Sequence, residues 1–223
     1  MNKWVENFLV WLVRNQPIPE YAKMSAPIPP SRPRASLSVV MTAAQTAWDV
    51  EHVALPLPAT FVLMNRAYYD RSMGQPGNDV GMYDDAAFIV SALGFSAWNA
   101  NTDPSRYGWN AGAEKYMARL KPGVHTFRRL KHHASRPDGY MAFGQGERPV
   151  TVERIKQDGT IARTETGCFG INLHRGGVNG TSSEGCLTIP TGQWPMFDTT
   201  LTDILKKTGS PEFTLILIDG PIV

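Results

Sequence analysis

Residues 168–190 read Cys-Phe-Gly-Ile-Asn-Leu-His-Arg-Gly-Gly-Val-Asn-Gly-Thr-Ser-Ser-Glu-Gly-Cys-Leu-Thr-Ile-Pro. Apolar side chains occupy every second position from Phe169 to Leu173, which predicts a β-strand that ends at His174. A glycine-rich loop follows and leads to Cys186, which stands directly after Gly185. An imidazole at a strand end and a thiol beside a glycine are the parts that a nucleophilic cysteine needs.

Short runs typical of β-strands surround this stretch, and one helical run follows it. They predict a mainly β domain over residues 59–223, with one helix after Cys186. We expect strands at 61–69, 86–90, 95–99, 124–127, 139–145, 150–155 and 213–218, and the helix at 191–207.

Residues 1–58 differ in character and are expected to form a helical segment with a proline-rich linker. Helices are predicted at 3–14 and 36–52, and prolines crowd residues 17–35 between them. The first helix either packs on the protein or contacts a membrane surface, because two tryptophans lie on its apolar face. Its apolar run is too short to span a bilayer and lacks a small-residue cleavage site, so no export signal is expected.

The composition is that of an ordinary globular protein: 223 residues, 42% hydrophobic, 19% charged and a net charge of +2. This charge does not favour nucleic acid as a partner. The densest basic cluster, Arg128, Arg129, Lys131, His132 and His133, is interpreted as a solvated surface, with an anionic polymer such as cell wall as the alternative. Two cysteines cannot make a disulfide scaffold, and without CxxC or HExxH spacing no metal or other cofactor is expected.

The cysteine and the histidine have two interpretations when they are judged from spacing alone. A free thiol has a pKa of ~8.5, so Cys186 needs a neighbouring base such as His174 to attack as thiolate. The amides of Gly185 and Cys186 would then donate to the developing oxyanion. In the other interpretation the cysteine is a small buried hydrophobe and the histidine is structural.

The stretch resembles the catalytic motif of the L,D-transpeptidase family, in which a strand ends in histidine and a loop ends in Ser-x-Gly-Cys. Here the motif is His174 with Ser183-Glu184-Gly185-Cys186, and residues 121–127 (Lys-Pro-Gly-Val-His-Thr-Phe) resemble the start of a strand in that family. The resemblance covers roughly residues 60–220 and is strongest over 169–187. It implies a β-sandwich fold and an acyl-enzyme formed with stem peptides of peptidoglycan.

By that resemblance Cys186 is the nucleophile and His174 its general base. The carbonyl of Arg175 would orient the imidazole, and the amides of Gly185 and Cys186 would form the oxyanion hole. Ser183, Glu184 and Thr188 are candidates for binding substrate. The family often has His or Lys where Glu184 stands, and Arg or Asn where Thr188 stands. Hydrolysis and transfer to an amine therefore both stay open, as does an inactive wall-binding or virion protein on the same fold.

Two further expectations concern Cys168 and the place of action. Cys168 is interpreted as a buried thiol on the strand of His174, with a redox-controlled disulfide to Cys186 as the alternative. Without an export signal, the protein is expected in the cytoplasm of the producing cell. It would act on the cell wall after release or delivery by another route, as a bacteriolytic endolysin or a secreted effector does.

Overall fold

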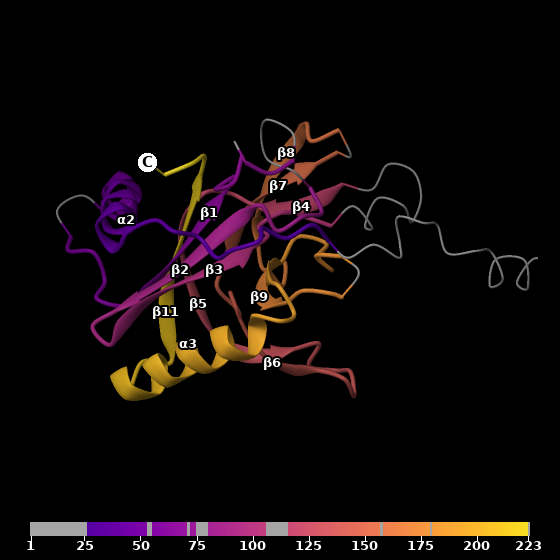
Figure 1. The fold of residues 1–223 in the computed structure, drawn as a ribbon. Coiled ribbons are helices and arrows are strands. Elements are labelled where there is room, and N and C mark those ends of the chain that lie inside the picture. Colours follow the sequence, from indigo (N-terminus) through magenta and orange to yellow (C-terminus); the bar gives the residue numbers. More distant parts are fainter. Residues whose placement is uncertain are drawn as a thin grey trace, which may run out of the picture.

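The computed structural model describes residues 26–52, 55–70, 72–74, 80–105, 116–156, 158–178 and 180–222. The predicted helix at 3–14 lies outside these residues. In chain order the described elements are α2 (Leu37–Glu51), β1 (Phe61–Arg66), β2 (Asp85–Ser91), β3 (Gly94–Ala100), β4 (Met117–Leu120), β5 (Gly123–His132), β6 (Tyr140–Gly144), β7 (Val150–Ile155), β8 (Ile161–Gly167), β9 (Asn172–Arg175), β10 (Leu187–Ile189), α3 (Trp194–Thr208) and β11 (Glu212–Asp219) (Figure 1).

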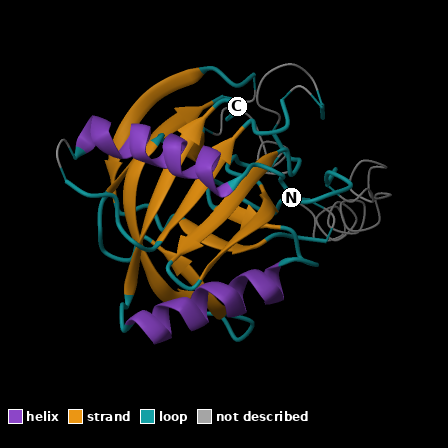
Figure 2. Ribbon diagram, turned by 60° about the vertical axis from the view of Figure 1, so that its left-hand side comes forward, coloured by secondary structure: helices purple, strands orange, loops and turns teal. Residues whose placement is uncertain are grey.

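The strands form one large mixed sheet and one small antiparallel sheet. The large sheet has the order β10-β9-β6-β5-β11-β1-β2-β3, and the small one has the order β4-β7-β8. Two neighbouring pairs of the large sheet, β1 with β11 and β9 with β10, are parallel. Figure 2 shows the large sheet curling between the two helices. The predicted mainly β fold, with one helix after Cys186, is confirmed.

The two faces of the large sheet bury different clusters because successive side chains of a strand point to opposite sides. Phe61 and Leu63 of β1 pack with Val40, Ala44 and Trp48 of α2. The alternate residues of β1, Val62 and Met64, face a larger cluster that includes the buried side of α3. Helix α2 thus shares a core with the strands, while the division of the chain at residue 58 stays a prediction.

Three of the four ends of the two described helices carry residues that favour these positions. Ser36 precedes α2, and its hydroxyl accepts the N–H of Val39 at 3.3 Å. Helix α3 has a proline in its first turn and ends at Gly209, whose φ of 66° is the left-handed conformation that glycine adopts readily. It begins three residues later than the sequence predicts, because Thr191–Gln193 form a turn closed on the Pro190 carbonyl.

The expected single strand over 168–174 is wrong, because the chain turns between two strands of different sheets. Strand β8 ends at Gly167 and β9 begins at Asn172, with Gly170 between them at a φ of +71°. Cys168 is therefore exposed rather than buried, and its thiol donates to the Glu147 carbonyl at 3.2 Å. Both cysteines are free thiols.

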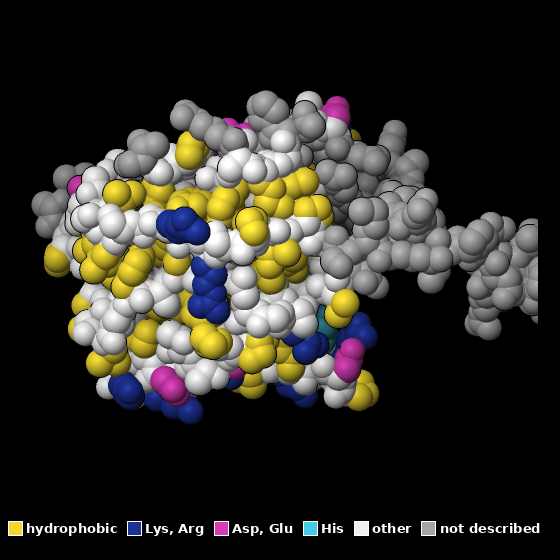
Figure 3. Space-filling view, in the orientation of Figure 1, with side chains coloured by type: hydrophobic (Ala, Val, Ile, Leu, Met, Phe, Trp, Pro, Cys, Tyr) yellow, Lys and Arg dark blue, Asp and Glu magenta, His cyan; other side chains and the backbone are white. Residues whose placement is uncertain are grey.

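The exposed surface mixes hydrophobic and charged side chains. Figure 3 shows hydrophobic side chains spread over one face, with charged side chains gathered mainly along the lower edge near α3. Large exposed hydrophobic residues include Leu37 and Met41 of α2, Phe95 of β3 and Met196 of α3. In the part of the chain that the structure describes, neither helix has the length and apolar character needed to cross a membrane.

Candidate functional site

A cavity of about 470 Å³ opens at the β9–β10 edge of the large sheet and contains both residues of the predicted dyad. Strands β9 and β10 run parallel in a register that pairs Leu173 with Leu187 and His174 with Thr188. Because Cys186 directly precedes β10, this register brings its thiol alongside the residues that begin β9. The lining includes His132, Asn172, His174, Glu184, Gly185 and Cys186.

His174 is buried, and its tautomer is set by its neighbours. Its Nδ1 lies 2.7 Å from the carbonyl oxygen of Arg175, so Nδ1 carries the proton and Nε2 keeps a lone pair. The Tyr140 hydroxyl donates to the same carbonyl at 3.3 Å. Burial, together with the neighbouring His132, lowers the pKa of His174 to about 3. The ring is thus an uncharged base at neutral pH, hydrogen-bonded to the Arg175 carbonyl that the family resemblance assigns to orienting it.

Cys186 is partly exposed to the cavity and has two backbone contacts. The N–H of Asn172 donates to its Sγ at 3.4 Å, and its thiol donates to the Gly170 carbonyl at 3.6 Å. Burial raises the pKa of Cys186 to about 11, and the charge of Glu184 adds to this effect. Among the described residues no hydrogen bond joins the thiol to His174. The resting pair is therefore neutral thiol and neutral imidazole rather than a preformed ion pair.

Ser183 stabilises the loop before Cys186 through hydrogen bonds within that loop. The Ser183 hydroxyl accepts the N–H of Gly185 at 2.9 Å and donates to the Cys186 carbonyl at 2.5 Å. Gly185 has a φ of +148°, and a Cβ added there would lie 2.6 Å from the Ala118 carbonyl oxygen of β4. Only glycine fits between the loop and β4 without displacement. Ser183 is buried and holds the loop, and the Gly185 amide is engaged inside it.

The predicted substrate-binding residues lie in different places relative to the cavity. Glu184 lines it, whereas Ser183 and Thr188 do not. Thr188 is buried in β10, where its backbone exchanges two 2.8 Å hydrogen bonds with Asn101. The Arg175 side chain is also outside the lining, with its guanidinium 4.9 Å from the centre of the Tyr140 ring.

His132 belongs to the site, and sequence reasoning missed it. Interpreting the whole basic cluster as a solvated surface is wrong for this residue, which is only 7% exposed. Its ring stacks on His174 with 4.2 Å between centroids and 14° between planes. The two residues meet because β5 and β9 both flank β6. That order could not be read from the local sequence around either histidine.

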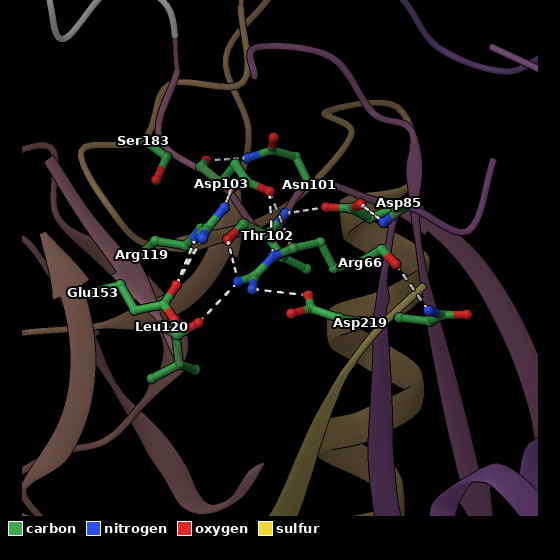
Figure 4. Close-up of polar contacts among 12 residues, drawn as sticks. Arg66, Asp85, Asn101, Thr102, Asp103, Arg119, Leu120, Glu153, Ser183 and Asp219 are labelled. Carbon is green, nitrogen blue, oxygen red and sulfur yellow. Dashed lines mark hydrogen bonds and ion pairs between the residues drawn. The ribbon is translucent and has the colours of Figure 1, made fainter. Parts of the chain in front are cut away.

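A buried charged network is centred on Arg66 (Figure 4). Arg66, at the end of β1, is 2% exposed and pairs with Asp103 at 3.5 Å and with Asp219 at 3.0 Å. Its guanidinium also donates to the Thr102 hydroxyl at 3.0 Å and to the Leu120 carbonyl at 2.8 Å. The network therefore fixes the segment that follows β3.

The segment that follows β3 is hydrogen-bonded to residues that precede and follow Cys186 in the sequence. Asn101 pairs with Thr188 after the cysteine, and the N–H of Ser105 donates to the Ser183 carbonyl before it, at 2.7 Å. The site thus has a rigid support that reaches from β1 to the loop of Cys186. The sequence offered only scattered charged residues as a signal for it.

No protein-family model matches the chain, and no curated protein matches it either. Within the described ranges, no group of three or more His, Cys, Asp or Glu side chains is arranged to hold a metal ion.

The buried histidines predict a loss of stability at mildly acidic pH. The pKa values of His174 and His132 are lowered to about 3 and about 4 by burial, and burial also lowers that of His125. At these histidines the unfolded chain therefore binds more protons than the folded one between pH 6.5 and 5, so their contribution to the free energy of unfolding falls as pH falls. For His174 alone we expect a loss of about 1.5 kcal/mol over this range.

Urea unfolding at pH 6.5 and pH 5 measures this loss, and His174→Gln is the comparison. The variant should lose about 1.5 kcal/mol less than the native chain over the same range. Equal losses in both proteins would contradict the assignment of His174 as a buried neutral imidazole.

Proposed function

We propose that the chain is a cysteine-dependent enzyme that cleaves or transfers peptide bonds in the stem peptides of peptidoglycan. The observation that carries the chemistry is the placement of His174 and Cys186. His174 lies in β9, Cys186 directly precedes the adjacent parallel strand β10, and both line one cavity. Nε2 of the imidazole is left unprotonated. The choice of substrate is supported by the resemblance of residues 169–187 to the L,D-transpeptidase motif.

In the proposed reaction, Nε2 of His174 takes the thiol proton as Sγ of Cys186 attacks the substrate carbonyl carbon. The tetrahedral intermediate collapses when the imidazolium returns that proton to the leaving amine, so the peptide bond breaks and a thioester remains. Water or a second amine then attacks the thioester with His174 again as base, and the thiol is restored. A neutral Cys186 thiol and a neutral His174 imidazole in the resting site are compatible with this mechanism, in which the proton moves to His174 as Sγ attacks the carbonyl carbon.

The oxyanion requires donors on the cysteine loop. The family resemblance assigns the amides of Gly185 and Cys186, but the Gly185 N–H donates to Ser183 at 2.9 Å in the resting site. The substrate oxygen would replace the serine hydroxyl as acceptor as charge develops on it. An anion accepts more strongly than a neutral hydroxyl does, so this exchange favours the transition state over the bound substrate.

The test compares Cys186→Ala with Cys168→Ala on purified sacculi and on a soluble stem tetrapeptide, with products identified by mass spectrometry. Cys168 is exposed and outside the cavity, so its variant is a matched control that should keep full activity. We expect Cys186→Ala to lose activity about a thousandfold or more. Equal product release by the two variants would rule out the cysteine mechanism.

The second candidate is a wall-binding protein with little or no catalysis. It is favoured by the pKa of Cys186, which burial raises to about 11, and by the carboxylate of Glu184 at the cavity. In that case native protein and Cys186→Ala would co-sediment equally with sacculi, and neither would release product. Product formation by the native chain and its loss in Cys186→Ala would decide for the enzyme.

A further inference from the structure

Three histidines in contact form a row that ends on the proposed base: the His133 ring is tilted by 49° against His132, and His132 stacks on His174. This row is called the stack below. His133 contacts His132 with 3.9 Å between ring centroids, and His132 contacts His174 with 4.2 Å between centroids and nearly parallel planes. His132 and His174 line the same cavity as Cys186. The stack therefore extends inward from the end of β5 to the reacting groups.

The position of His132 is fixed by two other strands. The Nδ2 group of Asn172 in β9 donates to Nδ1 of His132 at 3.0 Å, and the Tyr140 ring of β6 packs edge-on at 5.5 Å. An added Cβ at Gly144 would lie 2.0 Å from Oδ1 of Asn172, so the missing side chain there leaves room for the amide. Because Nδ1 accepts this bond, the neutral ring of His132 carries its proton on Nε2.

The charges around the pair oppose a proton on either ring. Burial, followed by the charges of His133 and Arg136 in the turn after β5, lowers the pKa of His132 to about 4. A proton on Nδ1 of His132 would also meet the Nδ2 donor of Asn172. Two parallel imidazoles in contact repel each other when both are charged.

Other titratable or charged groups face the two rings from the elements around them. From β6 the Tyr140 hydroxyl lies 3.3 Å from Nδ1 of His174, and the Arg175 guanidinium of β9 lies over the Tyr140 ring. Arg154 of β7 lines the cavity, as do Glu184 and Cys186 on the loop before β10. Glu184 is the one carboxylate and Arg154 the one arginine among the described lining residues.

We propose that His132 is a positioning residue, which covers one face of His174 and keeps that ring uncharged and fixed for its role as base. The inference rests on the proposed function of His174, since a base must hold no proton before substrate arrives. As a consequence of the stack, activity persists at acidic pH, where a solvated histidine would already be protonated. His132 itself takes no part in bond making.

The main test replaces His132 with Phe, which keeps a flat ring over His174 but removes the titratable nitrogens. An aromatic face attracts a cation, whereas a second imidazole repels that cation when it is itself protonated. We expect the titration of His174, followed by NMR with labelled histidine, to move up by about one pH unit or more. The His174→Gln variant assigns the resonance, and His125→Phe is the matched control on β5, outside the cavity.

His132→Gln is the second variant, and it keeps the test decisive if Phe does not fit. Glutamine removes both the ring and its charge, so the His174 titration again moves up. The acid limb of the kcat/KM profile should move with it in both variants. An unchanged His174 titration in a folded variant of either kind would overturn the inference.

The two proposals fail in different ways. The NMR titration needs no turnover, so it reports on the stack even if the native chain releases no product. Loss of product in Cys186→Ala, with an unmoved His174 titration in His132→Phe, would keep the enzyme and reject the role of the stack. A His174 titration that moves in His132→Phe, together with equal product release by Cys186→Ala and Cys168→Ala, would keep the role of the stack and reject the cysteine mechanism.

Discussion

Gly185→Ala is expected to lower kcat/KM about a hundredfold and the free energy of unfolding by about 3 kcal/mol. The new methyl group would lie 2.6 Å from the Ala118 carbonyl oxygen, and backbone atoms of β4 cannot turn aside as a flexible side chain can. The φ of +148° is also strained for any residue with a Cβ. The loop must shift, and with it the thiol that it presents to the cavity. A displacement of about 1 Å at reacting groups is enough for an effect of this size.

Gly192→Ala is the matched control for this change. Gly192 lies shortly after β10 and has no heavy atom within 4 Å of an added Cβ. Its alanine variant should keep native activity and unfold within about 0.5 kcal/mol of the native chain. Denaturant unfolding and stem-peptide turnover measure both effects. If the two alanine variants behave alike, the close contact between the loop and β4 does not control the site.

The signals that mark His174 and Cys186 as candidates are local, and the family resemblance favoured a dyad over a structural role for them. His174 ends an apolar run, and Cys186 follows a glycine in a loop of small residues. Seven expected strands and the helix after the cysteine were found for the same reason, since each depends on periodicity within a few residues. The short strands β4 and β10 were not predicted, because three or four residues carry little periodic pattern. Strand β8 was not predicted, because its residues are mostly exposed and polar.

The rest of the site depends on which strands lie side by side. His132 reaches His174 only because β5 and β9 flank β6, and no property of residues 128–133 distinguishes it from its exposed neighbour Lys131. Ser183 was expected to bind substrate by analogy with a motif, but its hydroxyl is bonded within the loop. Roles of this kind follow from contacts between distant segments, which a single sequence does not encode in any local pattern.

The charged network shows how such distant segments support the cysteine loop. Asp85 of β2 accepts the N–H of Ala67 at 2.7 Å and the N–H of Thr102 at 2.5 Å. It thereby ties the end of β1 to the segment that begins at Asn101. Burial, with the charges of Asp84 and Asp103, raises the pKa of Asp85, and the nearby Arg66 opposes this rise. Arg66 is therefore the group that allows several buried carboxylates to stay close together.

Arg66→Met is accordingly expected to lower the free energy of unfolding by about 3–5 kcal/mol at pH 7. Methionine fills much of the volume but leaves Asp103, which is 1% exposed, without its closest buried cation. Removing one partner of a buried ion pair costs this much because the remaining charge has lost its compensation. The Thr102 hydroxyl and the Leu120 carbonyl also lose their guanidinium donors.

The loss in free energy of unfolding caused by Arg66→Met should become smaller as pH is lowered from 7 to 5. Without Arg66 the folded-state pKa of Asp85 rises further above that of the unfolded chain, so the folded variant takes up protons and gains stability as pH falls. The matched control is Arg148→Met, which breaks an ion pair with Glu212 whose side chains are 57% and 32% exposed. That variant should lose at most about 1 kcal/mol at either pH. A similar small loss in Arg66→Met would mean that the network does not hold the segment, and the position of Cys186 would then need another support.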